Sequence, residues 1–439
     1  MTPCKFSQGV MLIGQLQELT FYLNHNILMF KDTFTRKTKV VFFSALLGLA
    51  SCQPYEFENP EKEDQLLETT SSQLIESHYI VVLKQEAINA RFSQKGNYHQ
   101  RTSAMKSAIA PILKKAKIPE EMVGHMYSST VLGFSAPLDE AMLERLRKEP
   151  EVSYIEQDRI ITIALPWERG EEDPGDEQEI PPGITRVGGA VDHSSCDNVA
   201  WIIDSGIDLD HPDLNVEISD GFNAFSNGRD AQTFDDGNGH GTLVAGTIAA
   251  IDNTIGVVGV AAGATVIPIK VLNSEGSGTY SGVIAGVDHV AANGKKGDVA
   301  NMSLGGPESQ ALDEAIVAAA GCGIIFCLSA GNNSDDANNY SPARTNGKNV
   351  YTISAMDQDD YWASFSNFGN PPVDFCAPGV SIKSTWKDGG YHTISGTSMA
   401  TPHAAGVFLV TGGKAFKDGK VMEDPDGTPD PIIVHKSKH

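Results

Sequence analysis

Basic residues are scarce in this chain relative to acidic ones. Its 33 Lys and Arg residues stand against 56 Asp and Glu residues, which gives a formal net charge of -23. Binding to nucleic acid needs a concentrated basic face, so this balance argues against a nucleic-acid partner. The acidic residues are expected to form a solvated surface, and the acidic run 168–179 is typical of an exposed linker.

Cysteine is also scarce, with six residues in a chain of 439. None of the six forms a CxxC pair, which argues against a zinc ribbon or a thioredoxin-type redox site. Four of them lie in one later region and could form up to two disulfides in an oxidising compartment. Three pairings are open for these four, which are Cys196, Cys322, Cys327 and Cys376.

Residues 1–52 are predicted to be an export segment, with Met29 a more natural start than Met1. Basic residues precede the apolar run 40–50, which at about a dozen residues is too short for a membrane-spanning helix of roughly 20. The run ends in Leu-Ala-Ser-Cys, which resembles the lipobox of bacterial lipoproteins and would place a lipid anchor on Cys52. The alternative is an ordinary secretory signal with a chance cysteine. Either reading predicts a secreted or cell-envelope protein, with 53–77 as a flexible linker.

The length favours two domains besides these processing segments. Over 78–163 the pattern predicts a small α+β domain in the order β-α-β-β-α-β, the ferredoxin-like arrangement. Its predicted strands and helices are 78–83, 102–116, 122–127, 131–136, a helix capped by Asp139, 152–155 and 160–163. This domain is either an independent binding module or a propeptide that serves the domain after it.

From residue 199 onward, apolar strands alternate with glycine-bounded helices, which predicts an α/β domain with a parallel sheet. The strand candidates are 199–203, 265–271, 299–303, 323–329 and 350–355. Functional residues in such sheets gather at the carboxyl ends of the strands.

Four polar residues lie at strand ends or helix starts in this domain. Asp204 ends an apolar strand, and His240 stands between two glycines at the start of a helix. Ser398 begins another helix after a glycine-rich approach, where free N–H groups favour a developing negative charge. Asn332 follows a further strand, where its amide could donate to an oxyanion. Singly, each residue is also explained by a turn or a helix cap.

Together, in the chain order Asp, His, Asn and Ser, these motifs resemble the signatures of the subtilases. The matching segments are Asp204-Ser205-Gly206, His240-Gly241-Thr242 and Gly396-Thr397-Ser398-Met399-Ala400, and the resemblance covers 187–413. It implies a subtilisin-like fold and a serine endopeptidase. Ser398 would be the nucleophile, His240 the general base and Asp204 its orienting carboxylate, with Asn332 and the Ser398 N–H forming the oxyanion hole. This chemistry needs no metal or other cofactor.

The resemblance also implies two segments that hold a substrate strand. They are Gly276-Ser277-Gly278 and Ser303-Leu304-Gly305-Gly306, and Ala330 and Gly331 lie beside Asn332. Main-chain pairing is largely blind to side chains, so protein and peptide substrates of broad sequence are expected. The alternatives are a catalytically silent surface-binding protein on the same fold and a processing protease of narrow specificity.

The segments Asn349–Ile353 and Val373–Gly379 resemble the proteinase K branch of the family. That resemblance implies a structural calcium held by the carboxylate of Asp374 and by main-chain oxygens of Lys348 and Val350, although Asp374 would also serve as a turn cap. The cysteine positions do not match the disulfides of proteinase K. The tail after 411 is shorter than usual, which predicts a reduced closing part of the fold.

With a subtilase behind it, the small domain resembles the subtilase propeptide, an intramolecular inhibitor that assists folding of a slow-folding parallel sheet. The resemblance implies self-cleavage between about Ile163 and Pro182, within an acidic linker over 164–182. The catalytic domain would then comprise 183–439.

Overall fold

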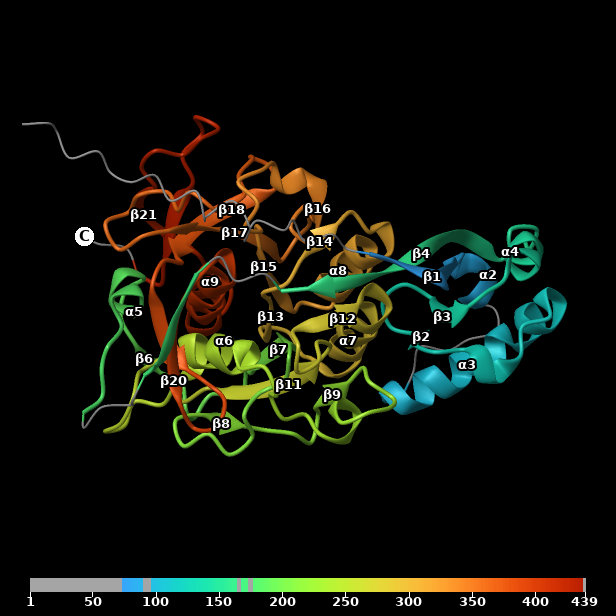
Figure 1. Ribbon diagram of the computed structural model, residues 1–439, viewed down its shortest axis with the longest axis horizontal. Helices are drawn as coiled ribbons and strands as arrows, with labels where there is room; N and C mark the ends of the chain where they lie inside the picture. Colours follow the sequence, from blue (N-terminus) through green and yellow to red (C-terminus); the bar gives the residue numbers. More distant parts are fainter. Residues whose placement is uncertain (1–72, 90–95, 164–166, 173–176, 437–439) are drawn as a thin grey trace, which may run out of the picture. The chain divides into compact units, whose positions relative to one another are not determined.

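The computed structural model describes residues 73–89, 96–163, 167–172 and 177–436 (Figure 1). All of these residues belong to one compact unit of the chain. Within them, no helix is long and apolar enough to cross a membrane. The predicted export segment lies outside the described residues.

The N-terminal domain has the predicted β-α-β-β-α-β order. Its strands β4, β1, β3 and β2 lie side by side in that order, and helices α3 and α4 pack on the sheet through one apolar core. A capping box of Asn97 and Gln100 begins α3, and Asp139 caps α4 as predicted. The bounds are β1 Leu74–Leu83, α2 Gln85–Asn89, α3 Tyr98–Ala116, β2 Met126–Tyr127, β3 Gly133–Pro137, α4 Glu140–Leu146 and β4 Val152–Thr162.

One strand of this domain is shorter than predicted. The segment 122–127 was expected to be extended throughout, but Glu120–Met122 forms a 3₁₀ turn directly after Pro119. Proline fixes its own φ near the value that begins a helical turn, so the strand starts only at Met126.

The second domain is built on a ten-stranded sheet whose path runs β21-β22-β18-β17-β15-β13-β7-β11-β8, with β9 also paired to β11. All the pairs are parallel except β21 with β22. The five strands predicted from the sequence are the central ones. The bounds are β7 Ala200–Asp204, β8 Asn215–Val216, β9 Phe222–Asn223, β11 Thr265–Lys270, β13 Val299–Met302, β15 Ile325–Ser329, β17 Val350–Met356, β18 Val373–Pro378, β21 Phe416–Lys420 and β22 Pro431–Val434.

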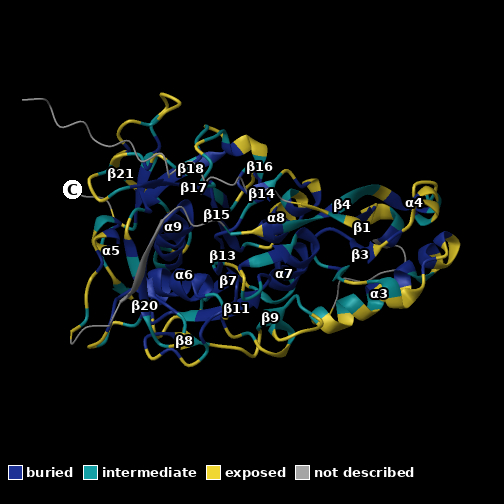
Figure 2. Ribbon diagram, in the orientation of Figure 1, coloured by how far each residue is buried: buried dark blue, intermediate teal, exposed yellow. Residues whose placement is uncertain are grey.

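Helices cover both faces of this sheet (Figure 1). Side chains alternate along β7, so that Trp201 and Ile203 pack on one face with α7 and α8, while Ala200 and Ile202 pack on the other with α6 and α9. Helix α6 is buried along its whole length (Figure 2). The helices are α5 Pro182–Arg186, α6 His240–Ala249, α7 Tyr280–Asn293, α8 Gln310–Gly321 and α9 Thr397–Thr411. This is the α/β architecture that the sequence predicted.

Two expected linkers need correction. The acidic segment expected to be a linker contributes strand β5, Trp167–Glu172, whose backbone pairs with β20, Tyr391–Ser395, beside β19, Ile382–Thr385. The linker expected over 53–77 ends earlier, because β1 begins at Leu74 and pairs with β3 and β4. After α9, the tail forms β22, which pairs with β18, and β21, which pairs with β22. The loop around Asp426 was predicted correctly.

The remaining short strands are β6 Val191–Asp192, β10 Ala261–Ala262, β12 Ser277–Thr279, β14 Gly306–Pro307 and β16 Tyr340–Ser341. The four cysteines of this domain form none of the disulfides that the sequence allowed. Cys196 and Cys322 are free and exposed, and Cys327 and Cys376 are free and buried.

Candidate active site

Asp204 and His240 form the buried centre of the site. Asp204 is the last residue of β7 and His240 the first residue of α6, and neither side chain is exposed. The Asp204 Oδ1 and His240 Nδ1 atoms are 2.8 Å apart, and the same oxygen accepts the Ser205 N–H. A carboxylate in this position selects the imidazole tautomer with its proton on Nδ1 and favours the charged ring.

The close approach of α6 to the end of β7 depends on glycine. A Cβ atom on Gly241 would lie 2.1 Å from the Gly206 carbonyl oxygen and 3.2 Å from the Asp204 Cβ. Gly239 has a φ of +111°, and a Cβ there would meet the Trp386 ring at 2.4 Å. The glycines on both sides of His240 therefore let the strand end and the helix start meet directly.

Ser398 lies in the first turn of α9 and is 5% exposed. Ser303 holds its backbone, because the Ser303 Oγ donates to the Ser398 carbonyl oxygen at 2.8 Å, while the Ser398 Oγ donates to the Ser303 carbonyl oxygen at 3.3 Å. Helices α6 and α9 are in contact, and Leu243 and Met399 from their first turns share one apolar cluster. The starts of the two helices, which carry His240 and Ser398, thus lie together.

Asn332 follows β15 and is fixed by the residue before Ser398. Its Oδ1 accepts both the Thr397 N–H at 2.9 Å and the Thr397 hydroxyl at 2.8 Å. Because both bonds hold the amide oxygen, the Nδ2 side of the amide faces away from Thr397. Asn332 and Ser398 line the same cavity.

This cavity gathers most of the predicted substrate-binding residues. Ser303, Leu304, Gly305 and Gly306 line it from one side, and Ala330 and Gly331 line it beside Asn332. The sequence analysis missed Ser329, Asn333, Tyr340, Ala343 and Thr397, which also line the cavity. Ser329, Asn333 and Thr397 adjoin the motifs and could have been found from them, whereas no motif marks Tyr340 and Ala343.

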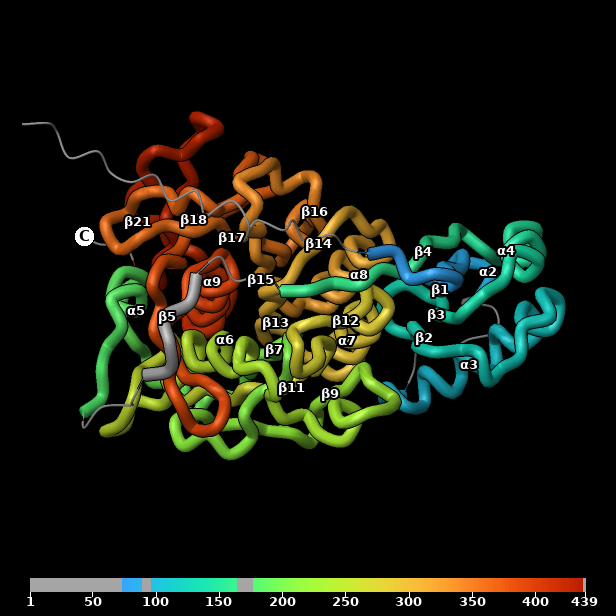
Figure 3. Tube along the Cα trace, in the orientation of Figure 1, coloured from blue at the N-terminus to red at the C-terminus, as the bar shows by residue number. Residues whose placement is uncertain are grey.

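The other predicted substrate segment is already paired with a strand of the same chain. Strand β4 of the N-terminal domain extends along β12, with Thr162 opposite Ser277 and Ile161 opposite Gly278 (Figure 3). The Ile163 N–H donates to the Gly276 carbonyl oxygen at 3.0 Å. Thr162 and Ile163 then line the cavity that contains Ser398. The end of the N-terminal domain therefore lies where a substrate strand was expected.

Buried carboxylates fasten the two domains together. Asp288 of α7 accepts the N–H groups of Ser128, Ser129 and Thr130 at 2.9, 2.7 and 2.8 Å. In the opposite direction, Asp158 accepts the Ser281 N–H in the first turn of α7, at 3.0 Å. Burial raises the pKa of Asp288, so the hydrogen bonds from the N-terminal domain compensate a desolvated charge.

Glu156 makes a similar contact with α8, because its carboxylate accepts the Ala311 N–H at 3.1 Å. An acidic side chain at a helix N-terminus satisfies a free N–H group and interacts favourably with the helix dipole. Two helices of the second domain are thus capped by the N-terminal domain.

The predicted calcium ligands lie on neighbouring strands. Asp374 is in β18, Val350 begins β17, and Lys348 is exposed just before it. Burial raises the pKa of Asp374 to about 6, and its Oδ2 accepts the Thr352 N–H at 3.0 Å. Its ionised carboxylate is a suitable oxygen ligand for calcium, although the ammonium of Lys417 already lies near it. Within the described residues, no group of three or more His, Cys, Asp or Glu side chains could hold a metal, so main-chain oxygens would have to complete this site.

Comparison with protein families and known proteins matches both domains. The model of the subtilase family matches residues 199–419, and the model of peptidase inhibitor I9 matches residues 78–164.

Three relatives illustrate the match. The chain is 38% identical over 383 residues to alkaline serine exoprotease A of Vibrio alginolyticus, which covers 82% of this chain and 66% of the relative. It is 38% identical over 307 residues to proteinase R of Parengyodontium album, covering 66% of this chain and 73% of the relative. It is 37% identical over 372 residues to an extracellular serine proteinase of a Thermus strain, covering 82% of this chain and 86% of the relative.

The contact between α6 and β7 gives a first test. In Gly241→Ala, the added Cβ collides with backbone that has no room to move, so His240 should shift relative to Asp204. Displacement of a reacting group by about 1 Å costs roughly 100-fold in rate, and we expect at least that loss in the hydrolysis of a chromogenic peptide. Gly321→Ala is the matched control, because a Cβ there meets nothing within 4 Å. Equal activity of the two variants would contradict this account of the site.

Proposed function

The chain is a serine endopeptidase of the subtilase family, and on this premise we propose that it is an exported, self-processing protease of broad specificity. The observation that carries the proposal is the buried hydrogen bond between Asp204 and His240, beside a cavity lined by Ser398 and Asn332. Family membership alone does not assign the roles of these residues.

In the proposed mechanism, the Ser398 Oγ attacks the scissile carbonyl carbon while His240 takes the hydroxyl proton. Asp204 stabilises the imidazolium that forms. The oxyanion of the tetrahedral intermediate accepts hydrogen bonds from the Asn332 Nδ2 and the Ser398 N–H, each such donor being worth about 2.7–4 kcal/mol in known cases. His240 then protonates the leaving amine, and water attacks the resulting acyl-enzyme with His240 again acting as base.

Substrates would bind as extended strands. The antiparallel pairing of β4 with β12 supports this, because the Gly276–Gly278 segment there pairs with a strand of the same chain through main-chain bonds. Gly278 keeps this segment close to the underlying chain, since a Cβ there would lie 2.2 Å from the Val271 carbonyl oxygen. Recognition through the main chain supports broad specificity.

The N-terminal domain would act as the intramolecular inhibitor, and its last strand would enter the site as the first substrate. Ile163 lines the cavity with Ser398, and the backbone of Trp167 pairs with Ser395, three residues before Ser398. Since the described chain approaches Ser398 from both sides, we place the self-cleaved bond between Ile163 and Trp167. This narrows the range of 163–182 predicted from the sequence. Residues 164–166 and 173–176 lie outside the described residues.

Export and anchoring remain predictions from the sequence. The structure does not describe residues 1–72. These include the apolar run 40–50, the lipid-anchor candidate Cys52 and most of the predicted linker 53–77. The relative from Thermus is named extracellular, which supports export of this chain. A lipid on Cys52 would stay with the propeptide after cleavage.

Ser398→Ala tests self-processing. We expect purified wild type to yield two fragments, with a new N-terminus between residues 164 and 167, because Ser398 attacks its own chain. The variant should remain intact under the same conditions. Intact-mass measurement and N-terminal sequencing provide the readout, and mixing a trace of wild type with the variant separates self-cleavage from cleavage in trans. Cleavage of purified Ser398→Ala alone at the same bond would contradict the proposal.

We also propose a structural calcium at Asp374, with oxygen ligands from Lys348 and Val350. Calcium prefers the ionised carboxylate, and the Asp374 pKa of about 6 means that this form is lost as the pH falls through that value.

Thermal unfolding tests the calcium proposal. Calcium should raise the Tm of wild type at pH 8, raise it less at pH 5, and have little effect on Asp374→Asn. Asp430→Asn is a matched control, because Asp430 is another buried carboxylate whose pKa burial raises to about 6, but it accepts hydrogen bonds from Ser354 and Asn370. This control should lose stability and keep its response to calcium. The same response in Asp374→Asn as in wild type would refute the assignment.

A further inference from the structure

We propose that Asp236 is a positioning residue that holds His240 in register with Asp204. The inference rests on the proposed function, because it concerns the same pair of residues. Asp236 lies four residues before His240, is 4% exposed, and does not belong to any motif that the sequence analysis identified.

The position of the first turn of α6 depends on hydrogen bonds to side chains outside the helix. The first N–H groups of a helix have no partner inside the helix. Here each finds a side chain: the His240 N–H donates to Asn238 Oδ1 at 3.2 Å, the Gly241 N–H to Ser205 Oγ at 3.0 Å, and the Thr242 N–H to Asp236 Oδ2 at 2.9 Å. The start of the helix is thus held by groups outside it.

Asp236 joins these groups into one assembly. Its Oδ1 accepts the Ser205 hydroxyl at 2.8 Å and the N–H groups of Asn238 and Gly239 at 3.0 and 2.8 Å. Its Oδ2 accepts both the N–H and the hydroxyl of Thr242, at 2.9 and 2.7 Å. Five donors therefore converge on one buried carboxylate, and they come from the strand end, the loop and the helix.

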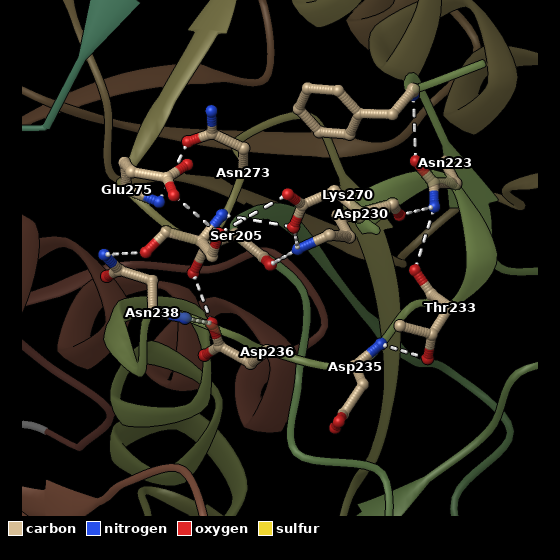
Figure 4. Close-up of polar contacts among 12 residues, drawn as sticks. Ser205, Asn223, Asp230, Thr233, Asp235, Asp236, Asn238, Lys270, Asn273 and Glu275 are labelled. Atoms are coloured by element: carbon tan, nitrogen blue, oxygen red, sulfur yellow. Dashed lines mark hydrogen bonds and ion pairs between the residues drawn. The ribbon is translucent and has the colours of Figure 1, made fainter. Parts of the chain in front are cut away.

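Ser205 is the link to the catalytic strand, because it directly follows Asp204. Figure 4 shows its hydroxyl donating to Asp236 and its carbonyl oxygen accepting the Lys270 ammonium at 2.5 Å. The same hydroxyl oxygen accepts the Gly241 N–H. Lys270 is fully buried in β11 and lies 3.3 Å from Asp230. Asp236 and Lys270 thus hold Ser205 from two directions, which fixes the end of β7 against the start of α6.

Several charged groups lie close together at this joint, by which we mean the contact of Ser205, Asp236 and Lys270 with the start of α6. The acidic groups around it include Asp204, Asp236, Asp230 and the buried Asp208, whose N–H donates to the Thr242 hydroxyl at 2.9 Å, and Lys270 is a buried basic group. The hydrogen bonds of Asp236 go to Ser205, to the loop residues Asn238 and Gly239, and to Thr242. Its effect on His240 therefore passes through Ser205 and the first turn of α6, which defines a positioning role and not a catalytic one.

Asp236→Asn is the variant that disturbs this joint with least change in shape. Every partner of both carboxylate oxygens is a donor, so an amide in either orientation places its NH₂ group against donors. The start of α6 should then move relative to Ser205 and Asp204. Asp236 reaches the substrate segment Gly276–Gly278 only indirectly, through Asn238, whose Nδ2 donates to the Ser274 carbonyl oxygen at 3.3 Å.

Asp298→Asn is the matched control. Asp298 is 1% exposed and accepts four donors, from Asn198, Val199, Trp201 and Lys295. These lie at the opposite end of β7 from Asp204. The control therefore replaces a similarly buried carboxylate, at the residue before β13, without touching the contacts of Asp236 at the start of α6.

The experiment compares the two variants with wild type, each made as the full chain, in peptide hydrolysis against pH and in thermal unfolding. For Asp236→Asn we expect kcat to fall about 100-fold and KM to change much less than kcat. The acid limb of kcat/KM, which reports the pKa of the base in the free enzyme, should move to lower pH because Asp204 stabilises the imidazolium less well. Asp298→Asn should lower the Tm and leave kcat and the acid limb unchanged.

Loss of activity in Asp236→Asn that only follows the folded fraction, with an unmoved acid limb, would overturn the inference. If this variant does not fold, Ser205→Ala takes its place, because it removes the link to Asp236 and leaves the Thr242 cap. A shifted acid limb and reduced kcat in Ser205→Ala support the inference, and an unchanged profile overturns it. Failure of the proposed function itself would appear separately, as wild type without hydrolysis that depends on Ser398.

Discussion

The hydrogen bond between Asp204 and His240 is the contact on which the rest of the site depends. It joins a strand end to a helix start inside the protein, where both groups are shielded from water. A pair of this kind stays aligned only if the surrounding backbone leaves it no other position. The glycines around His240 allow the approach, and the hydrogen bonds of Ser205 and Asp236 fix it. Electrostatic groups in such a dry site act strongly because they need no reorganisation.

The N-terminal domain both contacts the helices around this site and extends a strand into it. The carboxylates of Asp158 and Glu156 in the N-terminal domain accept free N–H groups at the starts of α7 and α8. In return, the buried carboxylate of Asp288 in α7 accepts an N–H group of the N-terminal domain. Its strand β4 pairs with β12 and reaches the cavity of Ser398. Strand β4 is thus part of the contact between the two domains and also lies in the position expected for a substrate strand, as suits an intramolecular inhibitor.

Much of this arrangement could be predicted from the sequence, because the central strands are apolar runs and the motifs follow them directly. The parallel sheet, the order of the small domain and the grouping of Ser398 with Asn332 all have local signals. Other features have none. The role of Asp236 depends on donors from two separated segments, Ser205 and residues 238–242, and Tyr340 reaches the cavity from the short strand β16, which no motif marks. The strand β5 was hidden because its pairing with β20 outweighs the acidic composition of its segment.

The most direct test of the central claim is to locate the adduct that a fluorophosphonate probe forms on the mature protein. Tandem mass spectrometry identifies the modified residue. We expect a single adduct on Ser398, formed quickly in wild type and far more slowly in Asp204→Asn, because the probe requires a serine activated by an oriented His240. An adduct at another serine, or no adduct on a folded and correctly processed chain, would contradict it.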